Sequence, residues 1–155
     1  MMIHAFKCTV CPPAIAALAI AAIMAGALAA PGKQFADYPA TDTFSGASAP
    51  IDASTAPRQW SAVRQVIKDI IRDDMAKGPN FAGAYFLASV GCGTGCEVIF
   101  VIDLRTGVIY VSPDAASNGV LFQKDSRLII IKENKFFDLP RSFQLFENGK
   151  FKQVE

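Results

Sequence analysis

The chain has 155 residues, of which 52% are hydrophobic and 19% are charged, and its 15 Lys and Arg residues nearly balance 14 Asp and Glu residues. A near-neutral chain with interspersed charges gives no electrostatic basis for binding nucleic acid or an anionic membrane. The length suits a single domain that buries its own hydrophobic core.

Residues 1–29 have the pattern of an export signal. A short head that carries Lys7 precedes the apolar run Ala14–Ala30, and Ala27 and Ala29 fit an A-x-A site with cleavage after Ala29. The run is at the short limit for a bilayer span, which needs about 20 residues, so a retained anchor is the weaker alternative. We therefore expect a periplasmic or secreted protein that has no stable membrane anchor after cleavage.

Cleavage would remove His4, the only histidine, together with the C-x-x-C pair Cys8 and Cys11. Without imidazole the usual serine–histidine and cysteine–histidine nucleophile pairs are excluded, as are the common histidine-based zinc sites. Acid–base chemistry would fall to carboxylates, lysine, tyrosine or a thiol. We therefore expect no catalytic residue of the common types, no metal and no cofactor.

Residues 30–56 are rich in Ala, Pro, Ser, Thr, Asp and Gly and show no periodicity, which predicts an extended irregular lead-in. An amphipathic helix is predicted to begin at Pro57 and to end at Lys77-Gly78-Pro79. Its apolar stripe, with residues three or four positions apart, consists of Trp60, Val63, Ile67, Ile70, Ile71 and Met75.

Short segments rich in β-branched and aromatic residues follow, separated by turn signals, and they predict strands. These segments are 82–90, 97–104, 107–112, 127–133, 142–147 and 150–154. Asn148-Gly149 is a strong two-residue hairpin signal, and Arg105-Thr106-Gly107 indicates a second hairpin. Because such short connections require antiparallel neighbours, residues 57–155 are predicted to form a single α+β domain: one N-terminal amphipathic helix packed on an antiparallel β-meander of about six strands.

Several of these strands are apolar on both faces. Ile99 and Val101 point one way, whereas Val98, Phe100 and Ile102 point the other way. A single helix covers one face of a sheet at best. We expect the sheet to be strongly curled or barrel-like; the alternatives are that the lead-in covers the second face, or that a partner or a second copy does so in a homo-oligomer.

Two cysteines lie in a glycine-rich stretch, Gly91-Cys92-Gly93-Thr94-Gly95-Cys96. If strands 82–90 and 97–104 pair around a three-residue loop, Gly93-Thr94-Gly95, then Cys92 lies opposite Cys96. Opposed Cβ atoms lie about 4.5–5.5 Å apart, a disulfide needs about 3.5–4.5 Å, and the glycines permit the local pucker. Because an exported protein meets an oxidising compartment, we expect a Cys92–Cys96 disulfide.

The disulfide would make Gly91, Gly93, Thr94 and Gly95 a rigid candidate binding tip. Two functional alternatives are less well supported. A redox centre normally uses C-x-x-C at a helix N-terminus, and an anion-binding glycine nest lacks the helix and lysine of a phosphate loop here.

Other polar residues are weaker candidates for a site. Carboxylates at strand ends or turns could form a catalytic pair, although capping of turns through their own backbone is the simpler interpretation. The tyrosines are more typical of core or rim aromatic residues. These weaker candidates are Tyr85, Glu97, Asp103, Tyr110, Asp125 and Arg127.

The chain resembles an uncharacterised family of small exported bacterial proteins with the pattern NFAGHY, GCGTxC, IDxxTGxVY and DSRLLI. The matching stretches here are Asn80–Tyr85, Gly91–Cys96, Ile102–Tyr110 and Asp125–Ile130, and the chain departs at Ala84, where the pattern has histidine. The resemblance implies export and a shared fold but no reaction.

These features together predict a non-enzymatic binding module for a protein or envelope component, of which an inhibitor or immunity-type protein for an envelope enzyme is one form. The alternative is a thiol-disulfide redox or carboxylate-based envelope enzyme.

Overall fold

The structure is a computed structural model that describes residues 33–60 and 71–155. The chain divides into two units, Met1–Ala30 and Pro31–Glu155. The predicted export signal lies outside the described residues, and so does the middle of the predicted helix. No helix within the described ranges is both long and apolar enough to cross a membrane.

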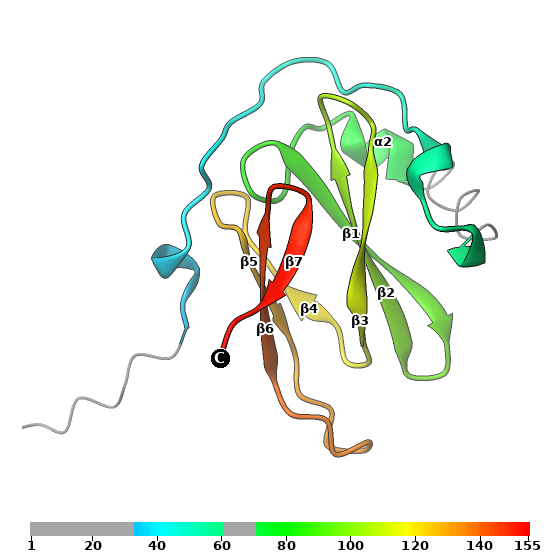
Figure 1. Ribbon diagram of the computed structural model, residues 1–155, viewed down its shortest axis with the longest axis vertical. Helices are drawn as coiled ribbons and strands as arrows, with labels where there is room; N and C mark the ends of the chain where they lie inside the picture. The colour runs from blue at the N-terminus through cyan, green and yellow to red at the C-terminus, as the bar shows by residue number, and fades with distance from the viewer. Residues whose placement is uncertain (1–32, 61–70) are drawn as a thin grey trace, which may run out of the picture. The chain divides into compact units, whose positions relative to one another are not determined.

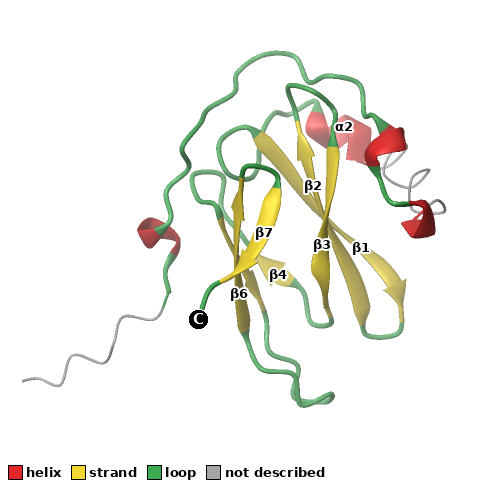
Figure 2. Ribbon diagram, viewed as in Figure 1, coloured by secondary structure: helices red, strands yellow, loops and turns green. Residues whose placement is uncertain are grey.

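Two antiparallel sheets make up the fold (Figure 1). The first sheet has the order β1-β2-β3 and contains β1 (Tyr85–Gly93), β2 (Cys96–Asp103) and β3 (Ile109–Ala116). The second sheet has the order β4-β5-β6-β7, and Figure 2 shows the strands of both sheets in yellow. It contains β4 (Val120–Leu121), β5 (Leu128–Ile131), β6 (Ser142–Glu147) and β7 (Lys150–Gln153).

The predicted fold class is therefore wrong. The strands form two separate sheets of three and four strands, not one strongly curled or barrel-like meander. In the part of the chain that the structure describes, the helical elements are short. They are the 3-10 turns η1 (Phe35–Asp37), η2 (Ala53–Thr55) and η3 (Arg58–Trp60) and the helix α2 (Arg72–Met75).

Both apolar faces of the first sheet are covered by other parts of the chain. One face packs against Ala56, Ile71 and Met75, with Phe44, Ile51 and Trp60 at the margin. On the other face Leu87, Ile99 and Val101 share a buried cluster with Ile129, Ile131 and Phe146 of the second sheet. The second sheet and the lead-in thus cover the two apolar faces, which the sequence-based prediction expected a barrel to enclose.

Local pairing follows the sequence more closely. Placing Cys92 opposite Cys96 predicts a β1–β2 register that is confirmed along the strands, since Phe86 pairs with Ile102, Ala88 with Phe100 and Val90 with Val98. Asn148 and Gly149 both have positive φ, 51° and 72°, as a two-residue hairpin turn between β6 and β7 requires.

The lead-in is irregular, yet it hydrogen-bonds to the first sheet and its turns. Phe44 N donates to Gly83 O at 2.9 Å, and Asp52 N donates to Gly107 O at 2.9 Å. Both glycines have positive φ, and a Cβ on either would lie within 2 Å of a lead-in carbonyl oxygen, that of Asp42 or Pro50. Glycine at these two positions is what lets the lead-in lie against the domain.

Candidate functional site

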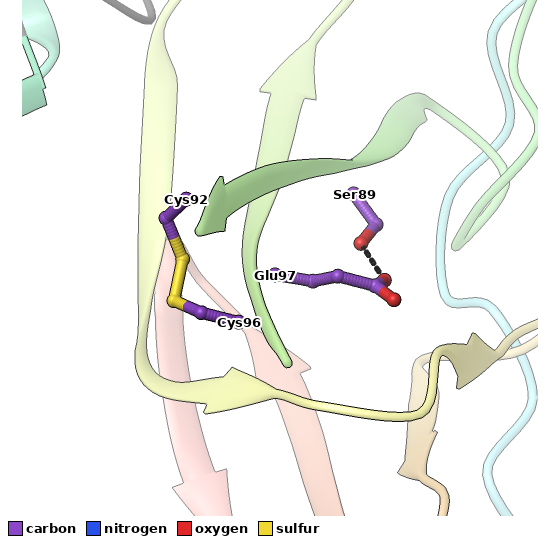
Figure 3. The surroundings of a disulfide bond; sticks show 4 residues. All are labelled: Ser89, Cys92, Cys96 and Glu97. Atoms are coloured by element: carbon purple, nitrogen blue, oxygen red, sulfur yellow. Dashed lines mark hydrogen bonds between the residues drawn. A yellow bond between two sulfur atoms is a disulfide. The ribbon is translucent and has the colours of Figure 1, made fainter. Parts of the chain in front are cut away.

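The disulfide lies at the end of the β1–β2 hairpin (Figure 3). Cys92 and Cys96 are bonded, with their Cα atoms 5.2 Å apart, which confirms the predicted pairing. The predicted three-residue loop is wrong, because Gly93 pairs with Cys96 and the register shifts between Gly91 and Gly93. The extra residue of this bulge is Cys92, and the turn is reduced to Thr94-Gly95.

The hairpin end is open to solvent. Every residue of Gly91–Gly95 is exposed. Just behind it, the Ser89 hydroxyl donates to a carboxylate oxygen of Glu97 across the two strands (Figure 3). This places Glu97, one of the weaker predicted candidates, beside the predicted tip and gives it a hydrogen-bonding role there.

A second exposed turn lies between β5 and β6. Asn134 exchanges two backbone hydrogen bonds with Leu139, of 2.8 and 2.9 Å. The Asn134 Oδ1 atom also accepts from the backbone N–H of Phe136 at 2.9 Å and of Phe137 at 3.3 Å. The turn therefore holds apolar side chains out in solvent: Phe136 is 88% exposed, Phe137 46% and Leu139 48%.

The two turns contact each other. A Cβ placed on Gly95 would lie only 2.6 Å from Phe137 Cε2, so the Phe137 ring lies directly over this glycine. The Phe136 and Phe137 rings in turn meet edge to face with centroids 4.9 Å apart. We call the exposed group Thr94, Gly95, Phe136, Phe137 and Leu139 the tip surface. It combines two residues of the predicted tip, Thr94 and Gly95, with three apolar residues that the sequence-based prediction missed.

A signal for the two phenylalanines was present in the sequence. Phe136-Phe137 stands between Lys135 and Asp138 in a stretch without strand alternation. Adjacent aromatic residues in a polar segment between strands indicate exposure rather than core, since a half-buried strand alternates.

A polar cluster surrounds Arg105 at the other end of β2. Its Nε donates to Asp103 Oδ1 at 3.0 Å, and its Nη2 donates to the Tyr85 hydroxyl at 3.1 Å. Its Nη1 donates to Asp42 of the lead-in. Burial, followed by the Asp103 charge, raises the pKa of Tyr85, and the hydrogen bond to Asp103 raises the pKa of Arg105.

Arg127 makes a parallel set of contacts. Its Nη1 donates to Glu147 Oε1 at 2.5 Å, and its Nε donates to the Pro39 carbonyl of the lead-in at 2.9 Å. Hydrogen bonds from Lys152 and then from Arg127 lower the pKa of Glu147. Both arginines thus tie the lead-in to the sheets.

These groups line a polar cleft of about 380 Å³, formed by Thr41, Asp42, Ala82, Tyr85, Arg105, Arg127, Phe146, Glu147 and Asn148. The Arg105 charge is paired with Asp42 and Asp103, and the Arg127 charge is paired with Glu147. The arrangement supports a clamp on the lead-in better than a site for a charged ligand.

The remaining candidates have separate places. Tyr110 packs on Phe146 with ring centroids 5.5 Å apart. The Asp125 carbonyl accepts from Ala40 N at 2.7 Å. Asp103 caps its turn by accepting from Arg105 N at 2.9 Å, as expected, and lies at the opposite end of β2 from Glu97. Glu97 and Asp103 therefore do not converge on one another.

Comparison of the chain with protein-family models, curated proteins and solved structures finds no match. The family resemblance therefore stays a prediction, and the case for a function rests on the geometry of the tip surface.

Proposed function

We propose that this chain is an exported, non-enzymatic binding module that contacts a protein partner through the tip surface. The observation that carries this proposal is the exposure of two adjacent phenylalanines, 88% and 46%, beside a disulfide-bonded hairpin end. Large apolar side chains are costly to leave in water, and grouped exposure of this kind is typical of interaction sites.

The tip surface is also held in place before any partner binds. The disulfide restrains one turn, and the Asn134 side chain restrains the other through its two backbone hydrogen bonds. Restraint of this kind lowers the entropy lost on association. Aromatic residues, phenylalanine included, are enriched at the cores of protein–protein interfaces.

The charges near the tip surface favour a protein partner. The second turn carries Lys135 and Asp138, with Glu133 and Arg141 on either side of it. Charges of both signs are interspersed here, whereas nucleic acid and anionic membranes bind to positively charged surfaces. An inhibitor or immunity-type protein for an envelope enzyme is the form of this function that fits an exported domain.

A comparison of variants tests the proposal. The purified protein, its Phe136→Ser/Phe137→Ser variant and a Leu121→Ser control are immobilised and exposed to envelope extract, and the retained proteins are quantified by mass spectrometry. Leu121 is 43% exposed and belongs to β4, outside the tip surface, so its substitution removes an exposed apolar side chain elsewhere on the domain. We expect a partner retained by the wild type and the control and lost from the double variant.

Circular dichroism and thermal melting establish that all three proteins are folded. Retention that does not differ between the double variant and the control would refute the tip surface as the contact. A binding-only function would be refuted by turnover of an envelope substrate by the wild type.

A further inference from the structure

The free edge of β1 is covered along half of its length and open along the other half. β1 is an outer strand of its sheet. At its start Tyr85 exchanges backbone hydrogen bonds of 3.0 Å with Phe81. Next, the Asn80 side chain donates to Leu87 O at 3.0 Å and accepts from Leu87 N at 2.7 Å. Tyr85 and Leu87 therefore both direct their backbone groups away from β2.

The backbone groups of the residues two and four positions after Leu87 also point away from β2. In an antiparallel ladder, successive residues alternate between facing the neighbouring strand and facing away. Ser89 and Gly91 consequently direct their N–H and C=O groups away from β2. Both residues are exposed, and within residues 33–60 and 71–155 no hydrogen-bond partner is found for these groups.

We infer that the open edge pairs with the same edge of a second copy of this chain, in an antiparallel two-fold arrangement centred on Val90. In this register Ser89 of each copy lies opposite Gly91 of the other. Each such pair exchanges two backbone hydrogen bonds, so every open group on the edge gains a partner. The two three-stranded sheets would become one continuous sheet.

Two observations favour a second copy over an unrelated peptide. The open stretch is limited at one end by Asn80 on Leu87 and at the other by the bulge after Gly91. In a second copy related by the two-fold axis, the same two limits occur in the opposite order. Leu87 of one copy therefore lies opposite Gly93 of the other, which follows the bulge and is outside the regular register. A longer foreign strand would run into Asn80.

The second observation is charge. Residues 88–92 are Ala-Ser-Val-Gly-Cys and carry no charged side chain. Natural edge strands often carry lysine or proline that prevents edge pairing, and this stretch has neither. The paired stretch itself therefore contributes no like charges, and the hairpin ends of the two copies point in opposite directions.

A pair of substitutions at Gly91 tests this inference. Gly91→Pro removes the outward N–H group, and proline is tolerated at such edge positions. Gly91→Ala keeps the N–H and is the matched control, since a Cβ there meets nothing within 4 Å and the φ of Gly91 is not positive. Sedimentation velocity over a concentration series measures the monomer–dimer equilibrium of the exported protein.

We expect a reversible dimer whose dissociation constant rises about tenfold or more in Gly91→Pro and changes little in Gly91→Ala. Hydrogen exchange of the wild type gives a second readout that needs no variant: the amides of Ser89 and Gly91 should exchange more slowly in concentrated than in dilute protein. A wild type that stays monomeric up to its solubility limit would overturn the inference. A dimer whose Ser89 and Gly91 amides exchange at a concentration-independent rate would also overturn it.

Discussion

Single glycines decide where the lead-in can lie. Gly107 has a φ of 76°, and an added Cβ would lie 1.9 Å from the Pro50 carbonyl oxygen. Gly78 has a φ of 97° but open space around it. Both glycines have a left-handed backbone conformation, but the lead-in approaches only Gly107 closely.

Alanine at both positions separates these effects. Gly78→Ala should lower the free energy of unfolding by about 1–2 kcal/mol, the cost of a left-handed backbone for a residue with a Cβ. Gly107→Ala should lower the free energy of unfolding by roughly 1–3 kcal/mol more than Gly78→Ala does, because the backbone of the lead-in must move away. Denaturant unfolding measures both. Equal losses would show that the lead-in does not press on Gly107.

The Glu147 carboxylate should make stability depend on pH. Because hydrogen bonds from Lys152 and Arg127 lower its pKa in the folded chain, its contribution is fully present above the ordinary glutamate pKa. The contribution is lost as the pH falls through the lowered folded value. Unfolding measured from pH 7 to pH 3 should therefore show a smaller acid loss for Glu147→Gln than for the wild type. Asp138→Asn, at an exposed position in the second turn, is the matched control for loss of a surface carboxylate.

At the scale of the element, the disulfide restrains a hairpin that the rest of the first sheet already supports. Closing so short a loop contributes only about 2 kcal/mol in the chain-entropy model. A Cys92→Ser/Cys96→Ser variant should therefore fold and lose about that much stability in denaturant unfolding. Failure to fold would show that the disulfide is needed for the fold itself.

The same variant separates the disulfide's contribution to stability from its restraint of the tip. If the sulfurs serve only to restrain the tip, its partner retention should fall while β1 and β2 keep their register. Chemical shifts of Val98, Phe100 and Ile102, at the centre of the sheet, report that register. A variant with full retention would assign partner binding to the aromatic turn alone.

Hairpins and the disulfide were predictable from the sequence because their signals are local. Asn148-Gly149 and the Cys92–Cys96 spacing each act over a few residues. The end of β3 was not predictable in this way. The predicted strand 107–112 ends before Pro113, yet β3 continues to Ala116, since the register shift between Val98 and Phe100 lets a bulge accommodate the proline.

The arrangement of the sheets and the tip surface were beyond local signals. Apolar faces on both sides of a strand say that something covers them, but not whether it is a barrel wall, a lead-in or another sheet. Likewise, the contact of Phe137 with Gly95 joins segments far apart in the sequence. Only tertiary packing reveals that the predicted tip continues into an aromatic turn.

At the scale of the whole molecule, a buried polar link joins the two sheets. Gln144 of β6 is 1% exposed, and its Nε2 donates to Asp114 Oδ2 on β3 at 2.6 Å. Its Oε1 lies 2.9 Å from the Ser112 hydroxyl. Gln144→Leu should cost about 1–3 kcal/mol of unfolding free energy, because the buried Ser112 hydroxyl loses its Gln144 acceptor and Asp114 loses one of its two amide donors.

Gln153 is the control for this prediction. It donates to the same Asp114 oxygen from an exposed position on β7. Gln153→Ala should therefore change stability by less than about 0.5 kcal/mol. A larger loss from Gln153→Ala than from Gln144→Leu would contradict the view that the buried amide links the sheets.

Contact between the tip surface and a protein partner can be tested by photo-crosslinking in the compartment where the protein resides. A photoreactive phenylalanine analogue replaces Phe136 in one strain and Leu121 in another. We expect a defined covalent adduct from position 136 and none from position 121. No adduct at 136, or the same adduct from both positions, would contradict a binding role for the tip surface.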